Sequence, residues 1–104
     1  MQKRGCKALA KLADDDAENQ GEIGAQGGIE LVLEAMRRHA GSADMQEPCC
    51  LALAYLACDN AENQGEIGAQ GGIELVLEAM RGHAVSAKLQ ERGCEALADR
   101  KSVV

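Results

Sequence analysis

The same 21-residue segment occurs twice in the chain, and this internal repeat constrains the fold more than any other feature. The segment reads AENQGEIGAQGGIELVLEAMR and starts at Ala17 and again at Ala61, an offset of 44 residues. The register continues beyond the identical block without a gap, since Cys6, Cys50 and Cys94 are also 44 residues apart. A period of this length is typical of helical repeat proteins, in which each unit buries its apolar face against the next unit.

The first helix of each period is expected to be short, from about Ala17 to Gln26 in the first copy. Asp15 precedes it at the capping-box spacing from Glu18. The glycine pair after the helix can adopt the left-handed conformation of a C-terminal cap and is a candidate hinge for exchange between copies. The two glycine pairs are Gly27-Gly28 and Gly71-Gly72. Asp59 and Glu62 repeat the capping-box spacing in the second copy.

The second helix is expected from about Ile29 to His39, and again from about Ile73 to His83. Apolar residues at i, i+3, i+4 and i+7 place one face of this helix in the core. In the first copy these residues are Ile29, Val32, Leu33 and Met36, with Leu31 and Ala35 expected to widen the buried face.

The third helix is expected to follow Asp44 and to run from about Met45 to Ala57, with copies at about 2–13 and 89–99. Asp44 and Glu47 repeat the capping spacing, and Pro48 is predicted in the first turn, where a missing N–H costs least. The expected apolar stripe consists of Cys49, Ala52, Leu53 and Leu56.

A short helix, a glycine turn, a long helix and a third helix reading Q-E-x-x-C-x-A-L-A-x-L-A together resemble the armadillo repeat family. The matching residues are Gly27, Gly28, Ile29, Leu31, Leu33, Gln46, Glu47, Cys50, Ala52, Leu53, Leu56 and Ala57, with Gly71, Gly72, Ile73, Leu75, Leu77, Gln90, Glu91, Cys94, Ala96 and Leu97 in the second copy. HEAT repeats are the nearest alternative, but they have two helices per unit and no short first helix.

The resemblance covers essentially the whole chain. It implies an all-α fold, namely an armadillo-like right-handed α-solenoid with two three-helix repeats of 44 residues plus a leading third helix. The single domain 1–104 would then consist of a partial repeat at 1–16, repeat one at 17–60 and repeat two at 61–104.

Armadillo proteins of the importin-α and β-catenin type bind extended peptides along a groove lined by third helices. Importin-α grips the peptide with a Trp and, four residues later, an Asn. The corresponding concave-groove positions here are Lys7 and Lys11, Leu51 and Tyr55, and Glu95 and Asp99. None of them is Trp or Asn, so the resemblance implies a short groove centred on Leu51 and Tyr55 but no nuclear-signal receptor.

The formal net charge of −6 argues against binding to nucleic acid or to an anionic membrane surface, which both need a basic face. No apolar run approaches the ~20 residues that span a bilayer. The five cysteines are an odd number, and three of them follow the repeat, which favours buried, reduced thiols over disulfides. The expected compartment is therefore the reducing cytoplasm, with the nucleus as an alternative.

No residue is nominated as catalytic, cofactor-binding or metal-binding, and an enzyme is not expected. His39 and His83 each end a second helix, where the helix dipole favours a positive charge. Cys49 and Cys50 are adjacent on a helix and point about 100° apart, which does not suit a shared metal ion. The segment GEIGAQGG lacks the Lys-Ser/Thr of a phosphate-binding loop.

The sequence therefore predicts a non-catalytic protein-interaction or scaffold module. The chain opens in the middle of a repeat and has no polar capping unit, so its apolar ends are expected to self-associate, most simply as a dimer. A peptide or protein partner in the groove is a further expectation. The alternative interpretation is an engineered or excised repeat fragment whose only activity is homo-oligomerisation, as an end-to-end or helix-swapped dimer.

Overall fold

The structure is a computed structural model that describes residues 2–98. Within this range the chain forms seven α-helices and no strand, so the predicted all-α fold is confirmed. The helices are α1 (Gln2–Ala13), α2 (Ala17–Ala25), α3 (Gly28–Arg38), α4 (Ala43–Ala57), α5 (Ala61–Ala69), α6 (Gly72–Gly82) and α7 (Ala87–Leu97).

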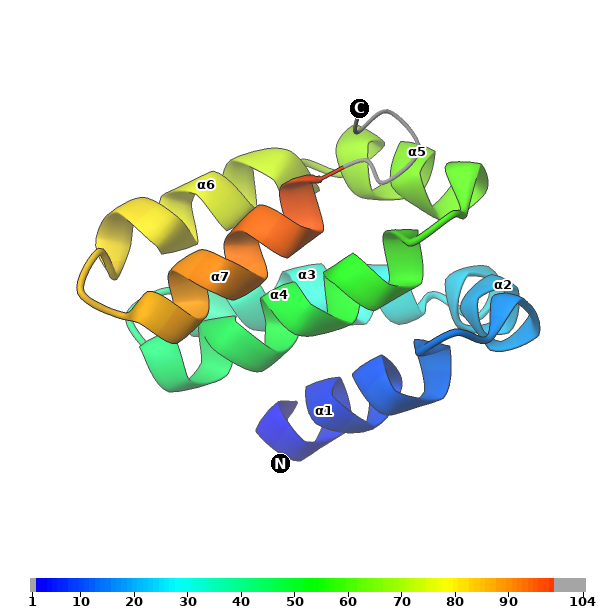
Figure 1. Ribbon diagram of the computed structural model, residues 1–104, viewed down its shortest axis with the longest axis horizontal. Helices are drawn as coiled ribbons and strands as arrows, with labels where there is room; N and C mark the ends of the chain where they lie inside the picture. The colour runs from blue at the N-terminus through cyan, green and yellow to red at the C-terminus, as the bar shows by residue number, and fades with distance from the viewer. Residues whose placement is uncertain (1, 99–104) are drawn as a thin grey trace.

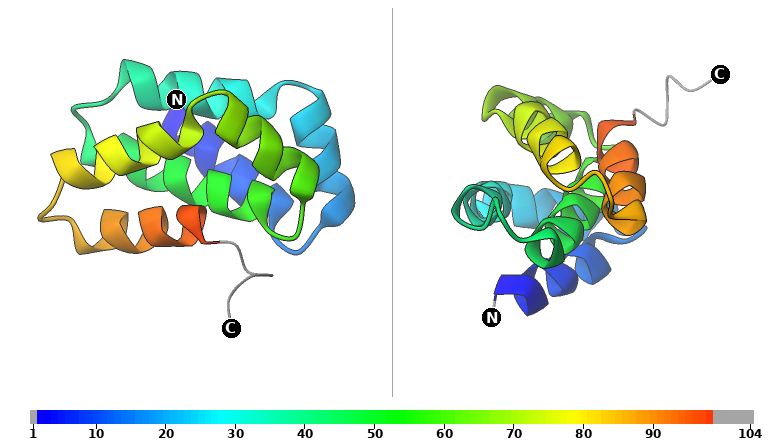
Figure 2. Two further views of the ribbon diagram at one scale, coloured as in Figure 1. Left: turned by 90° about the horizontal axis from the view of Figure 1, so that it is seen from above. Right: turned by 90° about the vertical axis from the view of Figure 1, so that its left-hand side faces the viewer.

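Helices that match in sequence lie next to one another in space. The three copies of the predicted third helix, α1, α4 and α7, form one layer with α4 in the middle (Figure 1). α3 packs on α4 and α6 packs on α7, and these two second helices are also neighbours (Figure 2). α2 and α5 lie at the same end of the molecule. The 44-residue repeat of the sequence is therefore also a repeat of the helix arrangement.

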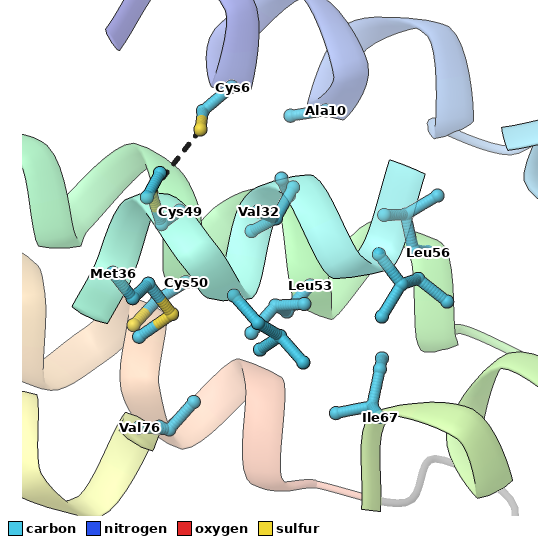
Figure 3. Close-up of a cluster of buried hydrophobic side chains, with 14 of the residues drawn as sticks. Cys6, Ala10, Val32, Met36, Cys49, Cys50, Leu53, Leu56, Ile67 and Val76 are labelled. Atoms are coloured by element: carbon cyan, nitrogen blue, oxygen red, sulfur yellow. Dashed lines mark hydrogen bonds between the residues drawn. The ribbon is translucent and has the colours of Figure 1, made fainter. Parts of the chain in front are cut away.

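The middle of the molecule is the best-packed part. The predicted apolar stripe of α4 is confirmed, because Cys49, Ala52, Leu53 and Leu56 are buried. Cys50 and Ala54 widen the buried face, and Figure 3 shows Cys49, Cys50, Leu53 and Leu56 in the core. The predicted face of α3 is confirmed as well, because Ile29, Val32, Leu33 and Met36 are almost completely buried. Leu31 is 69% exposed, so its predicted contribution to this face is wrong. It lies on the side of α3 that no helix of residues 2–98 covers.

The short helices start at Ala17 and Ala61 as predicted, but their predicted N-cap residues are wrong by one position. Asp16 is the N-cap of α2, and its Oδ1 accepts a hydrogen bond from the Asn19 backbone N at 2.9 Å. Asp15 instead has φ of 56°, in the left-handed region, whereas an N-cap residue takes an extended conformation. α5 repeats this arrangement, with Asn60 as its N-cap and Asp59 at φ of 53°. The turn before each short helix is one residue longer than the capping-box pattern predicts.

α4 and α7 start two residues earlier than predicted, at Ala43 and Ala87, whereas α1 has its predicted bounds. Ser42 is the N-cap of α4, and its Oγ accepts a hydrogen bond from the Met45 backbone N at 3.2 Å. The carboxylate of Asp44, which was expected to cap the helix, binds Lys3 Nζ at 2.9 Å instead. Pro48 consequently lies in the second turn and is buried, so its predicted first-turn position is wrong.

The glycine pairs form the tight turns that the sequence predicted. Gly27 and Gly71 both have φ of 82°, a conformation that side chains of L-residues rarely adopt. Gly28 begins α3 directly against Ile23, and a Cβ atom at this position would overlap the Ile23 side chain. Gly72 stands in the same relation to Ile67. A hinge role for these glycines stays a prediction.

Candidate functional site

Five of the six concave-groove positions predicted from the sequence lie on the three adjacent helices α1, α4 and α7. Lys7 and Lys11 are exposed, and Leu51 and Tyr55 are half-buried against the core. Glu95 is half-buried and accepts a hydrogen bond from Arg92. Asp99 lies outside the described residues. Peptide binding at these positions stays a prediction.

An apolar hollow lies elsewhere, between α1 and α3. It has a volume of about 920 Å³, and we call it the amino-terminal groove. Its lining consists of Arg4, Gly5, Cys6 and Leu9 from α1 and Leu31, Val32 and Ala35 from α3. No sequence pattern indicates this groove, because its residues lie in two segments that only the fold brings together.

The repeat shows what fills the equivalent space one unit further along. Adding 44 to each position of the groove gives Pro48, Cys49, Cys50, Leu53, Leu75, Val76 and Ala79, on α4 and α6. α3 packs against both of these helices and occupies the space between them. Cys49 is fully buried, whereas its counterpart Gly5 is exposed. The amino-terminal groove is therefore shaped for a helix with the apolar face of α3.

The opposite end of the molecule exposes the complementary kind of surface. Ile73 of α6 is 51% exposed, whereas the identical residue of α3, Ile29, is completely buried. Gly24 of α2 packs directly against Asn63 of α5, but Gly68, its counterpart in α5, has open space where a Cβ atom would stand. The outer sides of α5 and α6 thus present residues that are buried in the preceding copy.

The buried thiols of Cys49 and Cys50 are held in their neutral form. Cys6 Sγ and Cys49 Sγ are 3.2 Å apart across the α1–α4 contact (Figure 3). The hydrogen bond with Cys6, together with burial, holds the pKa of the Cys49 thiol well above its usual range. Burial and the nearby Glu47 carboxylate raise the pKa of Cys50 to about 12. A thiol in this environment is a poor nucleophile at neutral pH, because only the thiolate reacts.

The histidines follow second helices, as predicted. His39 and His83 are the C-cap residues of α3 and α6, and His83 Nε2 lies 2.9 Å from the backbone O of Ala40. No group of three or more His, Cys, Asp or Glu side chains able to bind a metal ion occurs within residues 2–98. In the same range, no helix combines the length and apolar character needed to cross a membrane.

Comparison of this chain with protein-family models, with curated proteins and with solved structures found no match.

Proposed function

We propose that this chain is a non-catalytic, armadillo-like repeat module that acts by binding protein helices at its ends, with other copies of itself as the first partners. The observation that carries the proposal is the amino-terminal groove, an apolar space of about 920 Å³ whose equivalent in the second repeat holds a helix. An apolar groove between two helices is a surface into which the apolar face of a further helix can dock.

The apolar residues at the two ends support self-association over binding to an unrelated small molecule. Leu31 and Leu12 are exposed near the amino-terminal end, and Ile73 is exposed on α6. Burial of one exposed large apolar side chain stabilises an assembly by about 1.5–3 kcal/mol. The entropic cost of association exceeds the contribution of one such side chain, so several of them must be buried together. Repeated units offer such a set, since both ends carry matching sequences.

The proposal includes a reducing compartment, the cytoplasm or the nucleus. The free thiols of Cys6 and Cys49 lie next to each other in space, and the free thiol of Cys94 is exposed. Free, exposed thiols suit a reducing environment better than an oxidising one.

Sedimentation velocity of the whole chain tests the proposed function. The sedimentation coefficient is expected to rise as the protein is concentrated from the micromolar to the millimolar range under reducing conditions. A single monomeric species over this entire range would contradict self-association as the function.

A further inference from the structure

The contact between the two repeats is a template for a contact between two copies of the chain. Asn63 Nδ2 of α5 donates a hydrogen bond to Gln20 O at 3.0 Å, and the Arg37 guanidinium donates one to Gln70 O at 2.8 Å. Gly24 lets Asn63 approach closely, because a Cβ atom there would overlap the asparagine side chain. These contacts join the outer side of unit 17–60 to the inner side of unit 61–104.

The residues needed to repeat these contacts are present at the two ends. Shifting each position by 44 places Gln64, Gly68 and Arg81 on one end and Asn19 and Gln26 on the other, with identical side chains. Asn19 Nδ2 donates one hydrogen bond, to Leu12 O at 2.8 Å. The matching Asn63 Nδ2 donates to Leu56 O at 2.8 Å and also to Gln20 O. An amide has two N–H donors, so Asn19 can likewise bind the Gln64 carbonyl of another copy.

Gly5 of the amino-terminal groove corresponds to the glycine of α7 that lies against α6. In α7, Gly93 lies against α6, and a Cβ atom there would come within 2.5 Å of Met80 Sδ. Gly5 holds the same position in α1, but a Cβ atom there would meet nothing within 4 Å. A glycine inside a helix is destabilising relative to alanine, and close approach of a neighbour is one reason for its presence. Gly5 leaves room for Met80 of a second copy.

α1 and α7 hold the same position in the repeat. A junction between two copies therefore has space for either α1 of one copy or α7 of the other, but not for both. Residues 4–10 read RGCKALA and residues 92–98 read RGCEALA, a single difference. Arg92 binds Glu47 of α4 at 3.1 Å, and Arg4, its counterpart, is exposed on the rim of the amino-terminal groove. α1 of one copy can therefore replace α7 of another, and Arg4 then takes the place of Arg92 beside Glu47.

We infer that copies of this chain assemble head to tail by helix exchange: α6 of one copy occupies the amino-terminal groove of the next, whose α1 replaces α7 of the first. The inference rests on the proposed self-association and names its partner surface. Each junction then continues the 44-residue repeat without a break. The copy at the end of an assembly keeps its own α7, which covers α6 as in the isolated chain.

The test is sedimentation equilibrium of the whole chain and two matched glycine variants. Gly5→Leu fills the groove, yet its side chain starts in open space in the isolated chain. Gly21→Leu is the control, because its counterpart Gly65 stays open even with the preceding unit in place. We expect Gly5→Leu to raise the dissociation constant about tenfold or more, and Gly21→Leu to leave it unchanged. Thermal melts at low concentration check that both variants fold.

Three outcomes separate the inference from the proposed function. A wild-type chain that stays monomeric contradicts the proposed function itself. Wild type and Gly5→Leu associating equally well overturns the groove as the contact, while self-association stands. Limited trypsin digestion then tests the exchange, because Lys88 and Arg92 lie in α7 and a helix that has lost its packing is cleaved more readily. Cleavage at these residues is expected to increase with protein concentration, and cleavage that stays constant or falls would overturn helix exchange.

Discussion

Two glutamines at equivalent positions of the repeat test how burial changes the contribution of a hydrogen bond to the free energy of unfolding. Gln46 is almost fully buried in α4, and its Nε2 donates to Met36 O at 3.1 Å and to His39 O at 2.8 Å. It thereby satisfies carbonyl groups at the C-terminal end of α3. Gln90 makes the same two contacts one repeat later, with Met80 O at 3.0 Å and His83 O at 3.1 Å, but it is only half-buried.

Replacing each glutamine by leucine removes the same two hydrogen bonds with different consequences. A net hydrogen bond contributes about 1 kcal/mol, and an acceptor left buried without a partner costs about 1–3 kcal/mol. Gln46→Leu is therefore expected to lower the free energy of unfolding by about 2–4 kcal/mol. Water can reach the carbonyls beside Gln90, so Gln90→Leu is expected to cost about 1 kcal/mol.

Urea denaturation followed by circular dichroism, at a protein concentration low enough to favour the monomer, measures both variants. A loss of 2 kcal/mol corresponds to a fall in Tm of about 8–16 °C for a domain of this size. Total stabilities of about 5–15 kcal/mol make such a difference easy to resolve. Equal losses for the two variants, or a larger loss for Gln90→Leu, would refute the argument that burial sets the cost.

Three further predictions concern close packing and the thiols. Gly24→Ala is expected to lower the free energy of unfolding by about 1–3 kcal/mol, because two hydrogen bonds hold Asn63 where the new Cβ would stand, while Gly68→Ala in the open position is neutral or stabilising at low concentration. Chemical denaturation compares the two, and an equal loss at both sites would count against the packing argument. Iodoacetamide at pH 8 is expected to modify the exposed Cys94 well before Cys50, whose pKa is raised to about 12, with peptide mass spectrometry recording the order. Burial also keeps the Cys50 thiol protonated in the folded chain, whereas in the unfolded chain it ionises near its ordinary pKa of about 9. Stability is therefore retained below about pH 9 and lost between about pH 9 and 12, and Cys50→Ala should weaken this alkaline loss in pH-dependent melts.

The sequence alone predicted much of the local structure. The period of 44 residues, the apolar face of α3 and the left-handed glycine before it follow from local chemistry that does not depend on neighbours. The helix starts were less predictable, because several Asp, Asn and Ser residues near each turn can all accept a hydrogen bond from a backbone N–H. Ser42 and Asp16 act as caps because the turn places them at the start of the helix, and the capping pattern alone does not predict the path of the turn.

The amino-terminal groove could not be predicted in the same way. Its residues come from α1 and α3, which are separated in the sequence by α2, and each of them is part of an ordinary apolar pattern. The open space arises because α1 has no second helix beside it among residues 2–98, whereas α4 and α7 have α3 and α6. One signal was available in the sequence, since Gly5 repeats Gly93 at a position where a helix prefers another residue.

The two identical segments of 21 residues mark the boundary between what the sequence determined and what the tertiary structure decided. Both form the same pair of helices with the same glycine turn, since identical local sequences have identical conformational preferences. Burial differs between the copies: Ile29 is completely covered and Ile73 is half-exposed. Burial depends on which neighbours surround a segment, and in this chain the first copy lies between other helices while the second forms an end. Only the folded arrangement separates a core residue from one that is available to another copy.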